Sequence, residues 1–182
     1  MAIGRARPTF AADAMLGSLA RKLRALGFDT SYYGSGEDAQ LVKLAATEGR
    51  VILTSDRELA GFARARGVPA ILLRGGSDGR RLSEIADAAG PLGLALVTGD
   101  PLCSLCGSAL ERVGKAEVSA EVPASVQRNH RAFFRCVRCG HVYWKGSHWK
   151  KLRSLASRLG QKQLATNNRR REGGGSAGEG DP

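Results

Sequence analysis

Residues 51–73 read Val51-Ile-Leu-Thr54-Ser-Asp56-Arg-Glu-Leu59-Ala-Gly-Phe-Ala-Arg-Ala-Arg-Gly67-Val-Pro-Ala-Ile-Leu-Leu73. The apolar run at 51–54 predicts a buried strand, and the run at 68–73 predicts another. Between them, Leu59, Phe62 and Ala63 recur at helical spacing and Gly67 provides a stop, which predicts a helix over 57–66. A strand, a helix and a second strand of this length are typical of a parallel sheet.

The same alternation extends through the first hundred residues. Strands are expected at 9–12, 28–33 and 94–97, and helices at 14–26, 37–48 and 80–89. In the first of these helices the leucines share one face, and Arg21, Lys22 and Arg24 are predicted to lie away from it. The predicted fold class of this part is therefore α/β, a parallel sheet with helices on both faces.

All four cysteines occur in two Cys-x-x-Cys pairs, and a glycine follows each pair: Cys103, Cys106, Cys136 and Cys139. This spacing lets two tight turns point four thiolates at one ion, so we expect one structural Zn²⁺. A closed shell of four thiolates leaves no open position for catalysis. Disulfides or a redox pair are the alternatives, although a redox motif needs only one pair.

The positive charge is unevenly distributed along the chain. Residues 1–100 contain 13 Lys and Arg against 11 Asp and Glu, whereas residues 122–171 contain 13 Lys and Arg and no acidic residue. A surface this basic indicates a polyanionic partner, most simply nucleic acid, and a solvated basic face without a partner is the alternative.

The chain of 182 residues is long enough for one domain and a small module. We expect an α/β domain over 8–99, the zinc ribbon with its basic helix over 102–160, and a disordered tail over 161–182. Apolar stretches are too short for a membrane span or a signal peptide. Together with metal-binding thiolates, which survive in reducing compartments, this predicts a cytoplasmic protein without membrane contact.

Three aspartates occupy matching positions in the predicted α/β repeat. Asp13 and Asp56 each follow a strand and open a helix, and Asp38 lies in the first turn of another helix. Residues at strand-to-helix turns of a parallel sheet converge on one edge, so the three carboxylates can form one acidic pocket for Mg²⁺ or Mn²⁺. The alternative is that Asp13 and Asp56 are helix N-caps, and the two roles are compatible.

Three segments resemble the Mut-seven C-terminal RNase domain family, a compact branch of the PIN-like nucleases. They are Phe10 to Asp29, Asp38 to Ala45 and Arg50 to Leu59. That family joins its nuclease domain to a four-cysteine ribbon that leads into a Tyr-Trp-Lys-Gly-Ser-His-Trp segment, which this chain matches at 143–149. The resemblance covers about residues 8–155.

By this resemblance, Asp13 is similar to the first acidic ligand of PIN domains, Asp38 to the third and Asp56 to the fourth. The resemblance also implies that Thr54 or Ser55 orients the site. Full PIN domains commonly supply a further acidic residue between the first and third, for which Glu37 is the nearest candidate.

The leading hypothesis is a metal-dependent ribonuclease that holds RNA on its basic ribbon. The candidate RNA contacts combine cations with aromatic rings that can stack on bases. They are Arg135, Arg138, Trp144, Lys145, His148, Trp149, Lys150 and Lys151. A non-catalytic RNA-binding or ribosome-associated adaptor is the alternative, and a toxin-like nuclease restrained by a partner is a third option.

Overall fold

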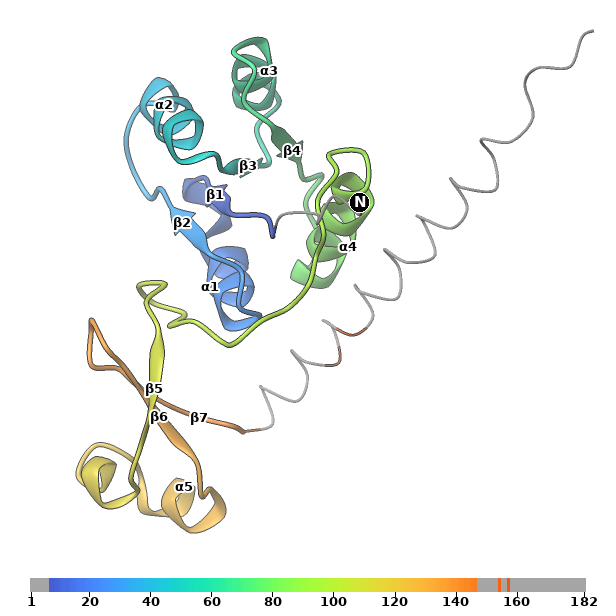
Figure 1. Cartoon of the computed structure of the whole chain (residues 1–182). Helices are drawn as coiled ribbons and strands as arrows, with labels where there is room; N and C mark the ends of the chain where they lie inside the picture. The colour runs from blue at the N-terminus through green and yellow to red at the C-terminus, as the bar shows by residue number, and fades with distance from the viewer. Residues whose placement is uncertain (1–6, 147–153, 155–156, 158–182) are drawn as a thin grey trace, which may run out of the picture.

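The computed structural model describes residues 7–146, Ser154 and Ser157. Its first part contains a four-stranded parallel sheet in the order β2-β1-β3-β4 (Figure 1). The strands are β1 (Phe10–Ala12), β2 (Thr30–Tyr32), β3 (Val51–Thr54) and β4 (Ala70–Leu72). The helices are α1 (Gly17–Ala25), α2 (Asp38–Glu48), α3 (Arg57–Ala65) and α4 (Asp78–Ala89). The predicted α/β fold class is confirmed.

Helices cover both faces of this sheet because its central strands are apolar on both sides. Phe10 and Ala12 of β1 belong to a core shared with α1 and α4, whereas Ala11 between them belongs to a core shared with α2 and α3. Since successive side chains of a strand point to opposite faces, one short apolar run supplies both cores.

The second part is a three-stranded antiparallel sheet in the order β5-β6-β7, which carries the cysteines. Its strands are β5 (Leu110–Val113), β6 (Phe133–Cys136) and β7 (Val142–Trp144), and the short helix α5 (Ala124–Asn129) precedes β6. The core of this unit is small, with Phe133 packed among Val118, Val122 and Val142. A module of this size needs more than its apolar core to remain folded.

The strand predicted at Leu94 to Val97 is wrong, because this segment has irregular backbone. Leu96 is buried in the core below α1 and α4, so the segment is apolar because it covers that core. The N–H of Leu94 donates to the carbonyl of Ala89 and that of Val97 to Ala95, whereas the carbonyl of Val97 accepts Nε of Arg7 (3.0 Å).

The chain then passes along the end of α1 on its way to the antiparallel sheet. The N–H of Gly99 donates to the carbonyl of Leu26 (3.2 Å), and that of Leu102 donates to the carbonyl of Arg24 (2.9 Å). Gly27 has φ +83°, and a Cβ there would lie 2.6 Å from the carbonyl oxygen of Asp100. Only glycine permits this approach, so the connecting segment is held against α1.

The basic helix predicted for residues 147–159 falls outside the described residues, apart from Ser154 and Ser157. Within the part of the chain that is described, no helix combines the length and apolar character that crossing a bilayer requires.

Candidate active site and metal centre

Asp13 and Asp56 follow two neighbouring strands at the same edge of the parallel sheet. Asp13 comes directly after β1, and Asp56 comes two residues after the end of β3, which pairs with β1. The chain turns to opposite sides after these two strands, from β1 to β2 and from β3 to β4. Such a switch point at the carboxyl ends of parallel strands is where ligands bind in open α/β sheets.

Thr54 connects the two aspartates. Its side chain is fully buried, and its hydroxyl donates to Oδ2 of Asp13. The hydroxyl oxygen of Thr54 also accepts the backbone N–H of Asp56 (2.9 Å). The family resemblance implied that Thr54 or Ser55 orients this site, and the structure assigns the Thr54 contacts to both aspartates.

Both aspartates also cap helices, each through Oδ1. Oδ1 of Asp13 accepts the N–H of Met15 (2.9 Å), and Oδ1 of Asp56 accepts the N–H groups of Glu58 (2.7 Å) and Leu59 (3.2 Å). Asp13 is 7% exposed, whereas Asp56 is exposed to solvent. Because a carboxylate has two oxygens, the cap leaves Oδ2 of Asp13 for Thr54 and Oδ2 of Asp56 for other partners.

Asp38 lies at the start of α2, the helix that follows β2, and is exposed. Glu37 is the N-cap residue of the same helix, although its side chain makes no capping bond. Over residues 7–146, 154 and 157, the cysteines form the group of ligand atoms close enough to hold an ion, and the three aspartates are not gathered in this way.

The chemical groups at the end of β3 suit a hard cation. Ser55 follows Thr54, and its buried hydroxyl oxygen has no hydrogen-bond partner among the described residues. Carboxylate and hydroxyl oxygens are the ligand types that Mg²⁺ prefers, usually with several waters. The residues at this edge therefore fit Mg²⁺ or Mn²⁺ in ligand type.

The four cysteines meet at the base of the antiparallel sheet. Their sulfur atoms all lie within 4.8 Å of one another, and the thiols are free. The distance is 3.6 Å between Cys103 and Cys139, and 3.4 Å between Cys106 and Cys136. A tetrahedral zinc site with Zn–S bonds of about 2.3 Å has S···S edges of about 3.8 Å, so the cluster fits one structural Zn²⁺.

The two Cys-x-x-Cys turns repeat one hydrogen-bond pattern. The N–H of Cys103 donates to the carbonyl of Ser108 and that of Cys136 to His141, five residues on in each case. The glycine after each pair donates back to the first cysteine. Gly107 and Gly140 have φ of +80° and +73°, a conformation that favours glycine. The two glycines therefore let the backbone turn around the sulfur atoms.

The surroundings make the thiols unequal. Hydrogen bonds from Ser108 lower the pKa of Cys106 to about 6. At Cys139 the N–H of His141 lowers the pKa, but burial and the neighbouring thiols outweigh it and raise the pKa to about 12. A divalent cation supplies the positive charge that lets all four groups be thiolates together.

Arg24 joins the first cysteine turn to the parallel sheet. It is 7% exposed, and its Nε donates to the carbonyl of Thr30 (2.7 Å) beside β1. Its Nη1 donates to the carbonyls of Ser104 (3.2 Å) and Leu105 (2.8 Å), between the first two cysteines. Burial lowers the pKa of Arg24, and the negative charge of Cys106 and Cys103 offsets part of this effect.

The expectation that Arg24 lies away from the apolar face of α1 is therefore wrong. It is four residues after the buried Ala20 and next to the buried Leu23, so it lies on the flank of the apolar stripe. That position could have indicated from the sequence that Arg24 is partly buried. Its hydrogen-bond acceptors, 80 and 81 residues further along the chain, could not be predicted in this way.

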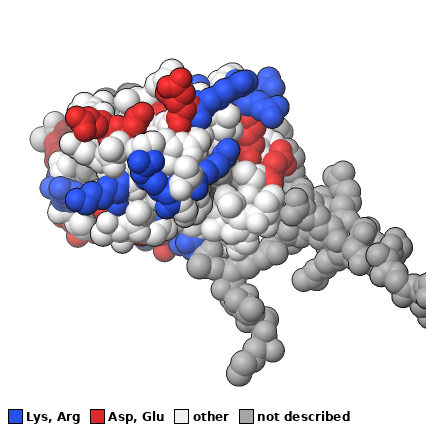
Figure 2. Space-filling view, turned by 90° about the horizontal axis from the view of Figure 1, so that it is seen from above, with Lys and Arg blue, Asp and Glu red and all other residues white. Residues whose placement is uncertain are grey.

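The candidate RNA contacts differ in whether they are ion-paired or exposed, and some lie outside the described residues. Arg135 is bound to Glu121 (2.7 Å), which lowers the pKa of that carboxylate. Arg138, Trp144 and Lys145 are exposed. The remaining candidates, His148, Trp149, Lys150 and Lys151, lie outside the described residues. Figure 2 shows Lys and Arg mixed with Asp and Glu on one face of the molecule. Charge alone therefore does not identify that face as an RNA-binding surface.

A parallel α/β sheet joined to a four-cysteine ribbon defines a class of two-part protein. The Mut7-C RNAse domain matches residues 8–156, most of the chain, so the protein belongs to the Mut7-C RNase domain family. No curated protein and no solved structure matches it. Family membership indicates a ribonuclease with a nucleic-acid substrate, and the predicted resemblance is confirmed.

Two further contacts were missed from the sequence. The hydroxyl of Tyr143 lies 3.1 Å from the sulfur of Cys103 and 3.2 Å from the hydroxyl of Ser104. Lys22 forms an ion pair with Asp78 at the start of α4, a helix that Ser77 caps. Both contacts join residues that are far apart in the sequence, so no local sequence pattern predicts them.

Proposed function

We propose that the protein is a metal-dependent ribonuclease that hydrolyses RNA phosphodiesters at the carboxyl edge of its parallel sheet. The observation that carries the proposal is the connection from Asp13 through Thr54 to Asp56, in a member of an RNase family. Asp13 and Asp56 would hold Mg²⁺ or Mn²⁺, with Asp38 as a third carboxylate. Such an ion, when bound, activates water and stabilises the leaving oxygen of the phosphodiester.

The residues around this edge prepare it for that role. Thr54 fixes Oδ2 of Asp13 and the backbone of Asp56, so neither group has to be reoriented when a ligand arrives. The N-terminus of α3 is directed toward the same edge, and its partial positive charge favours an anionic phosphate nearby. Residues fixed in advance lower the cost of reaching the transition state.

The basic ribbon and the residues after it would hold the RNA. Residues 122–171 carry 13 Lys and Arg and no acidic residue. If five to seven of these cations contact phosphate, the slope of log K against log salt is about −3.5 to −5 for a single strand. Measurement of RNA affinity across a salt series tests this part of the proposal.

The catalytic part is tested by incubating the zinc-loaded full chain with end-labelled RNA in Mg²⁺, in Mn²⁺ and with EDTA added to stop the reaction. Asp13→Asn, Asp38→Asn and Asp56→Asn are each expected to reduce cleavage by roughly 100-fold or more, and a double variant to lose little further. RNA affinity should stay near that of the wild type. In-line attack by water predicts products with a 5′-phosphate.

Asp29→Asn is the matched control, because Asp29 precedes β2 and therefore lies at the opposite edge of the sheet. It should cleave RNA at the wild-type rate. Full EDTA-sensitive activity in all three other variants would mean that the aspartates are only caps. Wild-type protein that binds RNA but cleaves none with any divalent metal would favour the adaptor function.

A further inference from the structure

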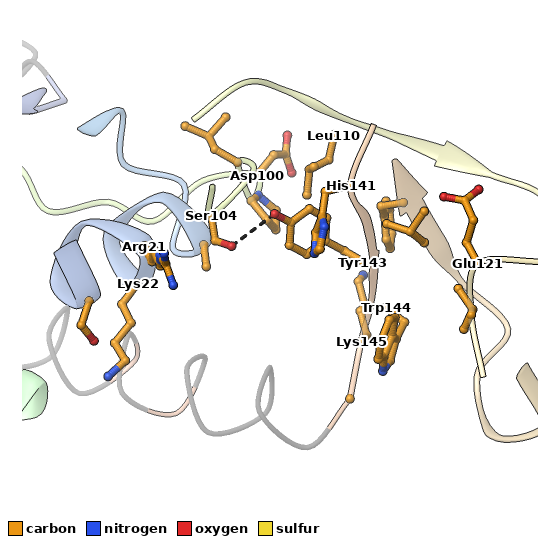
Figure 3. A pocket seen from close by; sticks show the side chains of 18 of the residues that line it. Arg21, Lys22, Asp100, Ser104, Leu110, Glu121, His141, Tyr143, Trp144 and Lys145 are labelled. Atoms are coloured by element: carbon orange, nitrogen blue, oxygen red, sulfur yellow. Dashed lines mark hydrogen bonds between the residues drawn. The ribbon is translucent and has the colours of Figure 1, made fainter. Parts of the chain in front are cut away.

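A large cleft separates α1 from the antiparallel sheet (Figure 3). Its volume is about 1350 Å³, whereas pockets for small molecules occupy about 300–1,000 Å³. Ser18, Arg21 and Lys22 line it from α1, and Tyr143, Trp144 and Lys145 line it from the β7 side. Its size and its two facing walls suit a segment of a polymer better than a small metabolite.

The wall formed by β7 presents an aromatic surface. Trp144 is 38% exposed and is one of the large hydrophobic side chains that remain open to solvent, whereas tryptophan is on average highly buried. Tyr143 beside it is held by its hydroxyl contacts to Cys103 and Ser104, and its ring meets that of His141 edge-on at 4.8 Å. An exposed ring on a fixed support is the usual platform for an unpaired base.

Cations flank this aromatic surface. Arg21 extends from the opposite wall and is exposed, and Nζ of Lys145 lies 5.4 Å from the ring centroid of Phe134. Of the two carboxylates that line the cleft, Glu121 is neutralised by Arg135, and for Asp100 no cation partner is seen among the described residues. The cleft therefore has phosphate-binding groups on both walls.

Part of the cleft lining lies close to Asp13 along the chain. Gly17 and Ser18, which line the cleft, follow Asp13 by four and five residues. From Arg21 back to Asp13 the helical rise amounts to about 14 Å, at about 1.5 Å per α-helical and 2.0 Å per 3₁₀ residue. This is the length of roughly four stacked nucleotides at about 3.4 Å each.

We propose that this cleft binds single-stranded RNA, with a base stacked on Trp144 and phosphates at Arg21 and Lys145, and directs the strand along α1 toward Asp13. The inference rests on the proposed ribonuclease function and adds the substrate class and the path. Duplex RNA does not fit the role, because its bases are stacked inside the helix and their faces are unavailable to an aromatic side chain.

The test measures the affinity of full-length, zinc-loaded protein carrying Asp13→Asn for a short single-stranded RNA and for a duplex of the same sequence. Trp144→Ala should weaken single-strand binding about tenfold, and Trp144→Phe should retain most of it. Arg21→Gln should weaken binding and make the salt slope shallower by about 0.7. Arg66→Gln, at the end of α3 on the other face of the sheet, is the matched control and should bind as the parent does.

Each outcome separates this inference from the proposed function. Protein that binds single-stranded RNA through Trp144 and Arg21 but, with Asp13 restored, never cleaves it leaves the cleft in place and removes the nuclease. RNA binding that is unchanged in both the Trp144 and the Arg21 variants, with zinc content intact, overturns the cleft proposal alone. Equal affinity for the duplex overturns the substrate class.

A further result would also overturn the inference. If Trp144→Ala leaves RNA affinity unchanged but makes residues 147–159 more sensitive to protease, the cleft holds the chain's own C-terminal segment. Crosslinking of RNA that contains 4-thiouridine gives an independent readout. Crosslinks at Tyr143 or Trp144 support the proposal, and crosslinks confined to residues beyond Gly146 contradict it.

Discussion

The hydroxyl of Thr54 and the carboxylate of Asp13 are joined at the ends of neighbouring parallel strands, where Thr54 donates to Oδ2. The same hydroxyl accepts a hydrogen bond from the N–H of Asp56, so one buried side chain fixes both aspartates. Neither aspartate can shift without breaking a bond to the same oxygen.

Removal of that hydroxyl should uncouple the two aspartates. Thr54→Val keeps the shape but leaves Oδ2 of Asp13 and the N–H of Asp56 without this partner, which should cost about 1–3 kcal/mol of folding stability. Thr54→Ser retains the hydroxyl. We expect cleavage and Mn²⁺ affinity to fall in the valine variant and to be largely kept in the serine variant. Equal activity in the two variants would show that the hydroxyl does not position the site.

Loss of zinc should affect the two parts of the chain differently. Cys103→Ser or Cys136→Ser should unfold residues 102–145, because metal binding supplies most of the folding free energy of such a small module. The parallel sheet should stay folded, since its two cores do not include the cysteines. Zinc analysis and amide hydrogen exchange check this, and protein purified without chelators that contains no zinc would contradict it.

Arg24 should contribute far more to stability than its neighbour Arg21. Arg24→Gln leaves the carbonyls of Ser104 and Leu105 without their charged donor, which should cost about 1–3 kcal/mol in urea unfolding of the zinc-loaded protein. Arg21→Gln, exposed on the same helix, should change stability by less than about 0.5 kcal/mol. Zinc should also pass faster to a competing chelator in the Arg24 variant. Identical unfolding curves would mean that this contact does not hold the turn.

Asp78 gives a pH-dependent contribution with a defined sign. Burial raises the pKa of Asp78, but hydrogen bonds from Lys22 and Ser18 and the charge of Arg81 outweigh it, so the pKa lies below its usual 3.8. A carboxylate with a lowered folded pKa stabilises the fold above the unfolded pKa and loses that contribution as pH falls through the folded value.

We therefore expect Asp78→Asn to be less stable than wild type by about 1–2 kcal/mol at pH 7. This difference should stay constant down to about pH 5 and shrink below about pH 4. Urea unfolding of both proteins at each pH measures it, and zinc loss at low pH affects both alike. A difference that grows on acidification would contradict the assignment.

The strands and helices of the parallel sheet were predictable because their pattern is local. The run from Val51 to Thr54 was predicted with the bounds that the structure shows, since three apolar residues and a threonine between a glycine-arginine turn and a helix cap leave little choice. Leu94 to Val97 has the same apolar character and forms no strand. Apolar composition reports burial, and only the partner strand decides whether a ladder forms.

The candidate sites were likewise predictable from the sequence only where their pattern is local. The spacing of the two cysteine pairs predicted a metal site, with which the cysteine cluster is consistent, and the glycine after each pair indicated a turn. The Thr54 link, the burial of Arg24 and the cleft beside Trp144 each depend on segments that meet only after folding. A sequence pattern therefore located the chemical groups, whereas their relation to one another required the three-dimensional arrangement.

The contact of Arg24 with the first cysteine turn also bears on the order in which the protein assembles. The arginine is synthesised 80 residues before its acceptor at Ser104. Domains form as units from the N-terminus as the chain emerges, so α1 can already be packed on the sheet when the first cysteines appear. The buried guanidinium of Arg24 would then be in place before the first cysteine turn forms against it. Failure of the early sheet to form would leave newly made cysteines without that surface, exposed to oxidation before they capture metal.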